Sequence, residues 1–157
     1  MSETSEKLAE AAKERGIRIA VAESLTCGLL ATTIGEASEA EAWFAGGVVA
    51  YQTPVKESLL GLEPGTDTCS AACAEQLARG VRELMSVDIA VSTTGVGGPD
   101  PQDGHAPGTV YLGWASADGV GHRRCEFSGD PEDVLRQTVD EALAVLLDQV
   151  GAGRDSR

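Results

Sequence analysis

Residues 21–31 read VAESLTCGLLA and pass from an apolar segment through an acid and a serine directly into a helix-forming segment. A buried strand that leads directly into a helix is typical of an α/β fold. Ser24 lies at the junction, where its hydroxyl could cap the helix by accepting a hydrogen bond from a backbone N–H group. The same N–H groups could instead stabilise an oxyanion, with Ser24 as the nucleophile. The junction alone leaves both roles open.

Helix and strand patterns alternate on both sides of this junction. Apolar residues at helical spacing and capping residues predict helices over 4–15, 25–35, 54–60, 71–85 and from 131 onward, with a short one within 39–47. Alternating or β-branched segments predict strands over 17–23, 47–52 and 88–95, and a hairpin over 109–127. This order predicts a single-domain α/β layered fold, a mixed sheet of about five or six strands covered by helices. We expect the domain to span residues 1–150 and residues 151–157 to form a flexible tail.

Composition excludes several classes of partner. The chain has 157 residues, enough for one domain, and a net charge of −13. Nucleic acids and anionic membranes require a basic surface, so we expect neither as a partner. A polar N-terminus and the lack of a long apolar run predict a cytoplasmic protein with reduced thiols. Cys69 and Cys73 lack a CxxC pattern or nearby histidines, so we expect no metal site and no organic cofactor.

Polar side chains follow the ends of three predicted strands. In open α/β sheets, ligands bind beyond the carboxyl ends of the strands, where loops lead into helices. These positions hold Ser24 and Thr26, then Tyr51 and Lys56, then Thr93 and Thr94. Their convergence favours a functional role for Ser24 over a cap alone.

A serine nucleophile needs a base, and Lys56 is the best placed. His105 lies in a predicted loop and His122 on an edge strand, which favours solvated side chains. Burial lowers the pKa of a lysine enough for it to act as a base, as in serine–lysine variants of the catalytic triad. Tyr51 could orient this pair or relay a proton. The alternatives are a surface lysine and an ordinary strand tyrosine.

Residues 93–99, TTGVGGP, form a glycine-rich loop after a strand. Closely spaced N–H groups in such a loop can hold phosphate or carboxylate, and Gly95, Gly97 and Gly98 are the candidates. The loop is neither a Walker A motif nor a dinucleotide fingerprint. Arg136, on the last predicted helix, is either an anion ligand or the partner of Asp140 one turn away.

Five stretches occur together in an order that resembles one known family. They are AESLTCG, WFAGGVVAYQTPVKESLLG, STTGVGGPD, GTVYLGWAS and DPEDVLRQ. Their order and approximate spacing are similar to those of the CinA C-terminal domain family, the competence/damage-inducible, nicotinamide-nucleotide amidase proteins. The resemblance covers roughly residues 5–150.

The resemblance implies an amidase that hydrolyses nicotinamide mononucleotide to nicotinate mononucleotide and ammonia, a step of pyridine nucleotide salvage. It implies Ser24 as the nucleophile, with Lys56 as the base and Tyr51 beside it. We expect the small-molecule nucleotide to contact Thr26, Thr94, Gly95, Gly97, Gly98 and Arg136. We also expect a homo-oligomer, a dimer or larger.

The chain also departs from the family pattern. Leu25 and Cys27 stand where the family has a cysteine and a glycine, and HAPGTV lacks the lysine that usually precedes the proline. Cys27 follows Ser24 by three residues, so in a helix it would share a face with Ser24 and be a rival nucleophile. Two other functions remain open: a serine–lysine amidase for another small amide, and a non-catalytic nucleotide-binding module.

Overall fold

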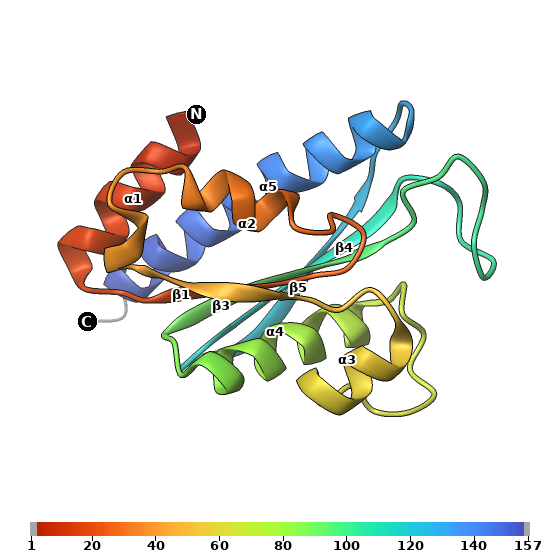
Figure 1. Cartoon of the computed structure of the whole chain (residues 1–157), viewed down its shortest axis with the longest axis horizontal. Coiled ribbons are helices and arrows are strands. Elements are labelled where there is room, and N and C mark those ends of the chain that lie inside the picture. The colour runs from red at the N-terminus through yellow and green to blue at the C-terminus, as the bar shows by residue number, and fades with distance from the viewer. Residues whose placement is uncertain (1–2, 156–157) are drawn as a thin grey trace.

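A computed structural model describes residues 3–155, and the side chains of residues 3–152. Its helices and strands alternate along the chain, as the sequence predicts (Figure 1). The elements are α1 (Glu3–Arg15), β1 (Ile19–Glu23), α2 (Leu29–Gly35), the 3-10 helix η1 (Ala40–Ala42), β2 (Phe44–Val49), α3 (Thr53–Leu60), α4 (Ala71–Met85), β3 (Ile89–Gly95), β4 (Thr109–Ser116), β5 (Gly119–Glu126) and α5 (Pro131–Asp155).

The strands form one mixed sheet of five strands in the order β2-β1-β3-β4-β5. β1 pairs in parallel with both β2 and β3, while β4 runs antiparallel to β3 and forms a hairpin with β5. The predicted fold class, a single-domain α/β fold with a mixed sheet covered by helices, is confirmed. The carboxyl ends of β1, β2 and β3 meet at one edge of the sheet because these strands are parallel.

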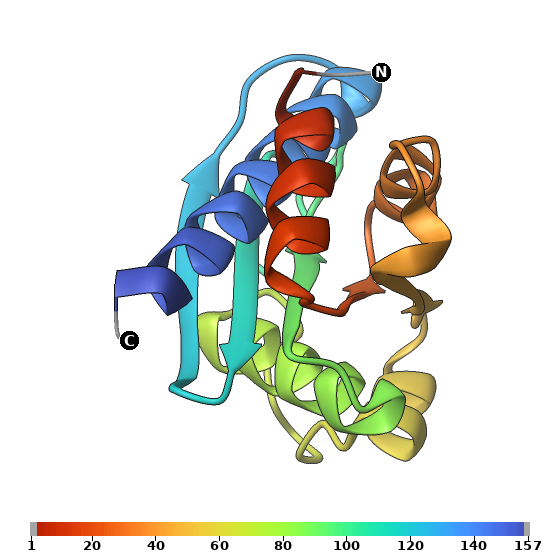
Figure 2. The same ribbon diagram turned by 90° about the vertical axis from the view of Figure 1, so that its left-hand side faces the viewer.

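Helices cover both faces of the sheet (Figures 1 and 2). Alternate residues of β1 point to opposite faces: Ile19 and Val21 pack against α1, α2 and α5, while Ala20 and Ala22 pack against α3 and α4. The two faces therefore have separate apolar cores, which consist mainly of Ala, Val, Leu and Ile. No helix of residues 3–155 is long and apolar enough to span a membrane.

Three predicted boundaries are wrong. The helix predicted over 25–35 begins only at Leu29, because residues 24–28 form a turn. The strand predicted over 47–52 lies instead at 44–49, so Tyr51 follows the strand rather than belonging to it. The helix predicted within 39–47 is reduced to the three residues of η1. In addition, α5 continues through 151–155, the start of the expected tail, and residues 156–157 lie outside the described residues.

The late start of α2 has a physical cause in Glu23. This side chain is 1% exposed, and its two carboxylate oxygens accept hydrogen bonds from the N–H groups of Leu30 (2.8 Å) and Ala31 (3.0 Å). A carboxylate at a helix N-terminus satisfies free N–H groups and the positive end of the helix dipole. The capping residue, Glu23, is the last residue of β1. Residues 24–28 therefore have to form a turn that brings the N-terminus of α2 back to the end of β1. Glu23, not Ser24, is therefore the residue that caps this helix.

Candidate active site

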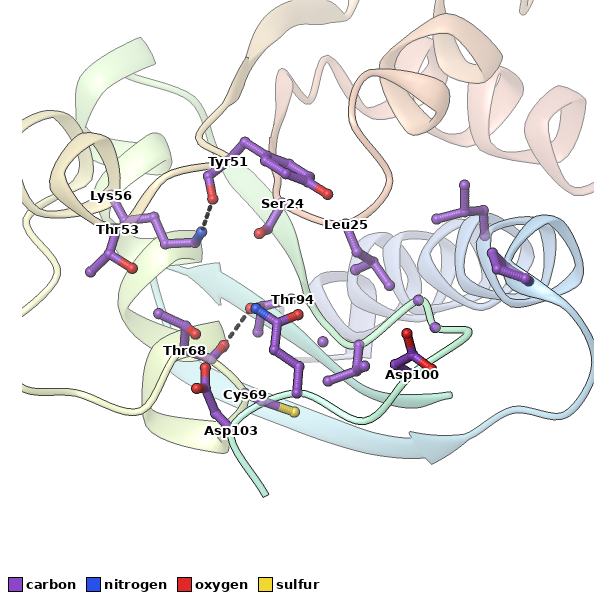
Figure 3. A pocket seen from close by; sticks show the side chains of 17 residues that line it. Ser24, Leu25, Tyr51, Thr53, Lys56, Thr68, Cys69, Thr94, Asp100 and Asp103 are labelled. Atoms are coloured by element: carbon purple, nitrogen blue, oxygen red, sulfur yellow. Dashed lines mark hydrogen bonds between the residues drawn. The ribbon is translucent and has the colours of Figure 1, made fainter. Parts of the chain in front are cut away.

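A cavity of about 330 Å³ opens at the carboxyl ends of β1 and β3. Residues from five segments far apart in sequence line it: Ser24, Leu25, Tyr51, Thr53, Lys56, Thr68, Cys69, Thr94, Gly95, Val96, Gly97, Gly98, Asp100, Gln102, Asp103, Pro131 and Leu135 (Figure 3). It thus combines the polar ends of the three parallel strands, as the sequence predicts. We call it the Ser24 pocket.

Ser24 is held in place through its backbone, and its hydroxyl is left free. Its N–H donates to the carbonyl oxygen of Thr93 at 3.1 Å, which fixes the residue beside β3. The side chain is only 8% exposed and lines the pocket. Within residues 3–155 its hydroxyl has no hydrogen-bond partner. Ser24 is therefore available for chemistry rather than committed to a cap.

The N–H groups at the start of the predicted helix over 25–35 stay candidates for oxyanion donors, but they belong to a turn because α2 begins only at Leu29. Glu23 already accepts the hydrogen bonds of Leu30 and Ala31, the first N–H groups after the start of α2. In the turn that follows Ser24, by contrast, the N–H groups of Leu25 and Thr26 donate to no atom of residues 3–155. Two free N–H groups directly after a nucleophile are the usual components of an oxyanion hole.

Lys56 is buried in the first turns of α3, with a side chain 2% exposed. Its ammonium nitrogen donates to the carbonyl oxygen of Tyr51 at 2.9 Å, and no carboxylate of residues 3–155 forms an ion pair with it. Burial lowers the pKa of Lys56 from its ordinary value, because an apolar environment disfavours the charged form. Figure 3 shows the Lys56 nitrogen and the Ser24 hydroxyl directed into the same space. A lysine in this state is suited to accept a proton.

Tyr51 contributes to the pocket in a way that the sequence does not suggest. Its side chain is 65% exposed and lines the entrance beside Ser24 (Figure 3). The atom that contacts Lys56 is its backbone carbonyl oxygen. Orientation of the lysine therefore comes from the main chain at Tyr51, and the phenol remains free to meet a ligand.

The glycine loop forms the opposite wall. Thr94 is buried and its hydroxyl donates to the carbonyl oxygen of Thr68, so Thr94 ties the end of β3 to the segment before α4. Gly95, Gly97 and Gly98 line the pocket as proposed. At Gly95 an added Cβ would collide with the backbone of Thr109 and Val110, so only glycine allows this close approach of β4.

The side chains of two predicted substrate-binding residues are not part of the described lining of this pocket. Thr26 is buried and its hydroxyl is hydrogen-bonded to that of Thr93 at 2.8 Å, so it supports the turn. Arg136 is 63% exposed and lies near the carboxylates of Asp133 (3.5 Å) and Glu132 (3.8 Å). These two acids precede it on α5, and neither is the Asp140 that the sequence suggested as its partner.

Other potential nucleophiles and bases are less suitable. Cys27 is exposed, has a left-handed backbone (φ 46°) and is absent from the described lining, so the expectation that it shares a helix face with Ser24 is wrong. Cys69 does line the pocket, but burial raises the pKa of its thiol to about 11. His105 and His122 hydrogen-bond to Asp67 and Glu75 (2.7 and 2.8 Å). None of these replaces Ser24 or Lys56.

Sequence reasoning missed several lining residues. Thr68 and Cys69 belong to the irregular segment 61–70, whose path no local pattern predicts. Asp100 and Asp103 belong to the loop recognised only for its glycines, and Leu135 was interpreted as part of the buried stripe of the last helix. The only sequence feature that could have identified these lining residues was the presence of Asp100 and Asp103 in a glycine-rich loop. Among residues 3–155, no group of three His, Cys, Asp or Glu side chains lies close enough to hold a metal ion.

Comparisons with known proteins agree on one family. The family model described as the CinA C-terminal domain matches residues 1–150. A putative competence-damage inducible protein of Bacillus velezensis is 48% identical over 145 residues, and one of Geobacillus kaustophilus is 40% identical over 152 residues. These matches cover 90% and 93% of this chain but 35% and 36% of the relatives. The chain thus spans about a third of the length of these curated relatives.

Solved structures are similar over nearly their full length. A CinA superfamily protein from Klebsiella pneumoniae matches with a TM-score of 0.91 and 30% identity, covering 96% of this chain and 97% of that one. The competence/damage inducible protein CihA from Agrobacterium tumefaciens matches with a TM-score of 0.86 and 25% identity, covering 94% and 96%.

Proposed function

The chain belongs to the CinA C-terminal domain family, and from this premise we propose that it is an amide hydrolase that uses Ser24 as nucleophile and Lys56 as base. The proposed reaction is hydrolysis of nicotinamide mononucleotide to nicotinate mononucleotide and ammonia. One observation carries the proposal: a buried lysine with a lowered pKa and no carboxylate partner among the described residues shares a pocket with an unpartnered serine hydroxyl.

The mechanism has two steps with an acyl-enzyme between them. Neutral Lys56 accepts the proton of the Ser24 hydroxyl while the oxygen attacks the carboxamide carbon. The N–H groups of Leu25 and Thr26 donate to the resulting oxyanion, and protonated Lys56 gives its proton to the leaving nitrogen, which departs as ammonia. Water, deprotonated by Lys56, then attacks the ester and releases the carboxylic acid. A net water is consumed for each ammonia formed.

A binding module without catalysis is the weaker candidate. Burying a lysine without a counter-ion destabilises a fold, and a protein that only binds a nucleotide gains nothing from it. The free Ser24 hydroxyl likewise serves no structural purpose that the hydrogen bonds reveal. Both features are accounted for by nucleophilic catalysis.

Ammonia release by the purified protein tests the proposal. Ser24→Ala and Lys56→Met should each remove nearly all activity, because residues that act as one unit lose most of the rate when either is removed. Cys27→Ser, at an exposed position outside the described lining, is the matched control and should retain activity. A trapped acyl adduct should map to Ser24 by mass spectrometry. Full activity of Lys56→Met, or an adduct on Cys27, would contradict the mechanism.

A further inference from the structure

A buried thiol that the proposed mechanism does not use lies next to Lys56. Cys73, in the first turn of α4, is fully buried in the apolar core between the sheet and the helices α3 and α4. Its thiol is hydrogen-bonded to Thr94 and lies close enough to Lys56 for each group to influence the pKa of the other. Because Lys56 and Thr94 both line the pocket of Ser24, the thiol belongs to the surroundings of the proposed base.

The hydrogen bonds of this cluster have a defined direction. The hydroxyl of Thr94 donates its proton to the carbonyl oxygen of Thr68 (Figure 3). A hydroxyl group has a single proton, so toward Cys73 the Thr94 oxygen can only accept, and the S–H group of Cys73 donates to it. The proton of the thiol is therefore directed at Thr94 and not at the amine of Lys56. What the sulfur presents to the amine is a weak hydrogen-bond acceptor.

Cys73 also brings no charge to the cluster near neutral pH. Burial raises the pKa of its thiol to about 11, so the thiol stays protonated. The other ionisable groups that act on it are Lys56 from α3 and, from the segment before α4, Asp67 and Cys69. Asp67 is engaged with His105 at 2.7 Å, and burial raises the pKa of Cys69 to about 11 as well. The group that α4 presents to Lys56 is therefore a neutral thiol.

We propose that Cys73 is a positioning residue for the base. Its sulfur fills the space beside the amine of Lys56 without accepting a strong hydrogen bond, so the ammonium form gains little there and the neutral amine keeps its lone pair free for the proton of Ser24. Cys73→Ser would place a stronger acceptor beside the amine and favour the ammonium form, because hydrogen bonds to charged groups are the strong ones. The inference rests on the proposed amide hydrolysis and adds a residue that controls its base.

The pH profile of kcat/KM for nicotinamide mononucleotide tests this role. Cys73→Ser and Cys73→Ala are a matched pair, because their side chains are of similar size and differ by one hydroxyl group. The acid limb of the profile reports the pKa of the base in the free enzyme. Its midpoint should lie about one pH unit higher in Cys73→Ser, since a hydrogen bond to a charged group is worth at least that much. Below both midpoints kcat/KM should therefore be about tenfold lower in Cys73→Ser, whereas the plateau at high pH should be the same in both variants.

The controls separate this role from packing. Cys73→Ala should keep the wild-type midpoint, because it adds no acceptor. Cys73→Thr and Cys73→Val are a second matched pair, of larger side chains, and should show the same difference in midpoint. Equal midpoints within both pairs, or a lowered plateau with an unchanged midpoint in Cys73→Ser, would overturn the inference. Circular dichroism over the same pH range establishes that each variant is folded.

A second measurement follows the base without catalysis. The chain has three lysines, and Lys7 and Lys13 lie on α1 with side chains 60% and 30% exposed. The NMR signal of the carbon next to the Lys56 amine should therefore titrate apart from theirs, at lower pH. Its midpoint should be about one pH unit higher in Cys73→Ser than in Cys73→Ala, and the same midpoint in both would overturn the inference. A folded wild-type protein that releases no ammonia would instead contradict the proposed function, and this titration would still decide the role of Cys73.

Discussion

The burial of Lys56 should lower the free energy of unfolding of the protein and, at the same time, make its amine available as a base. Burial lowers the pKa of Lys56 in the folded state from its ordinary value of 10.5. Below this lowered pKa the folded protein contains a buried charge, whereas in the unfolded chain the same charge is in water. The wild-type free energy of unfolding should therefore increase as the pH rises from the folded pKa toward 10.5. Activity should rise as the pH passes through the pKa of Lys56 in the folded protein and then level off, because the neutral amine is the base.

The variant Lys56→Met tests this at neutral pH. We expect it to be inactive but more stable by about 1 kcal/mol, or about 2–4 °C in Tm, since a buried charge is replaced by an apolar chain of similar length. Thermal unfolding between pH 7 and 10.5 measures both effects, and the pH-dependent gain should be missing in the variant. A variant less stable than the wild type across this range would show that the lysine is not destabilising.

At the scale of elements, the link between β1 and α2 depends on one carboxylate. Glu23 joins the end of the strand to the N–H groups of Leu30 and Ala31, and the turn between them carries Ser24. The cap thus sets the path of the turn that holds the candidate nucleophile and its oxyanion donors. A substitution that removes this cap should lower both the free energy of unfolding and the rate of catalysis.

Glu23→Gln should lower the free energy of unfolding by about 1–3 kcal/mol, because a buried charged acceptor of two N–H groups is lost. It should also lower kcat for ammonia release. Glu36→Gln, at the exposed C-terminal end of the same helix, removes the same charge without a cap and should change stability by less than about 0.5 kcal/mol. Equal unfolding curves for Glu23→Gln and the wild type would refute the role of this cap.

The elements differ in how well local sequence predicts them. The strands at β1 and β3 are evident because apolar residues are continuous there. Ser24 follows from its position just beyond β1, and Thr94 from its position at the polar end of β3. The start of α2 was not predictable, since its cap lies seven residues before Leu30 and capping patterns are read from adjacent residues. The sequence also did not predict that Asp103 and Leu135 line the Ser24 pocket. They become neighbours of Ser24 only when the loop and α5 fold together.

For the whole molecule, the charge of −13 gives a test of partners. The protein should not bind duplex DNA measurably at physiological salt, because its net negative charge is repelled by the phosphate backbone. Fluorescence anisotropy with a labelled duplex measures this. Micromolar binding that weakens steeply with added salt would contradict the expectation, since that slope reports phosphate contacts.

The contact between Lys56 and Tyr51 has a consequence for how this site tolerates mutation. The acceptor is a main-chain carbonyl oxygen, so no side-chain replacement at position 51 deletes it. A saturation library at this position should therefore yield variants that differ in ligand preference while the base keeps its orientation. Mutations at the pocket entrance can therefore change what the Tyr51 side chain contacts while the main-chain acceptor of Lys56 is kept.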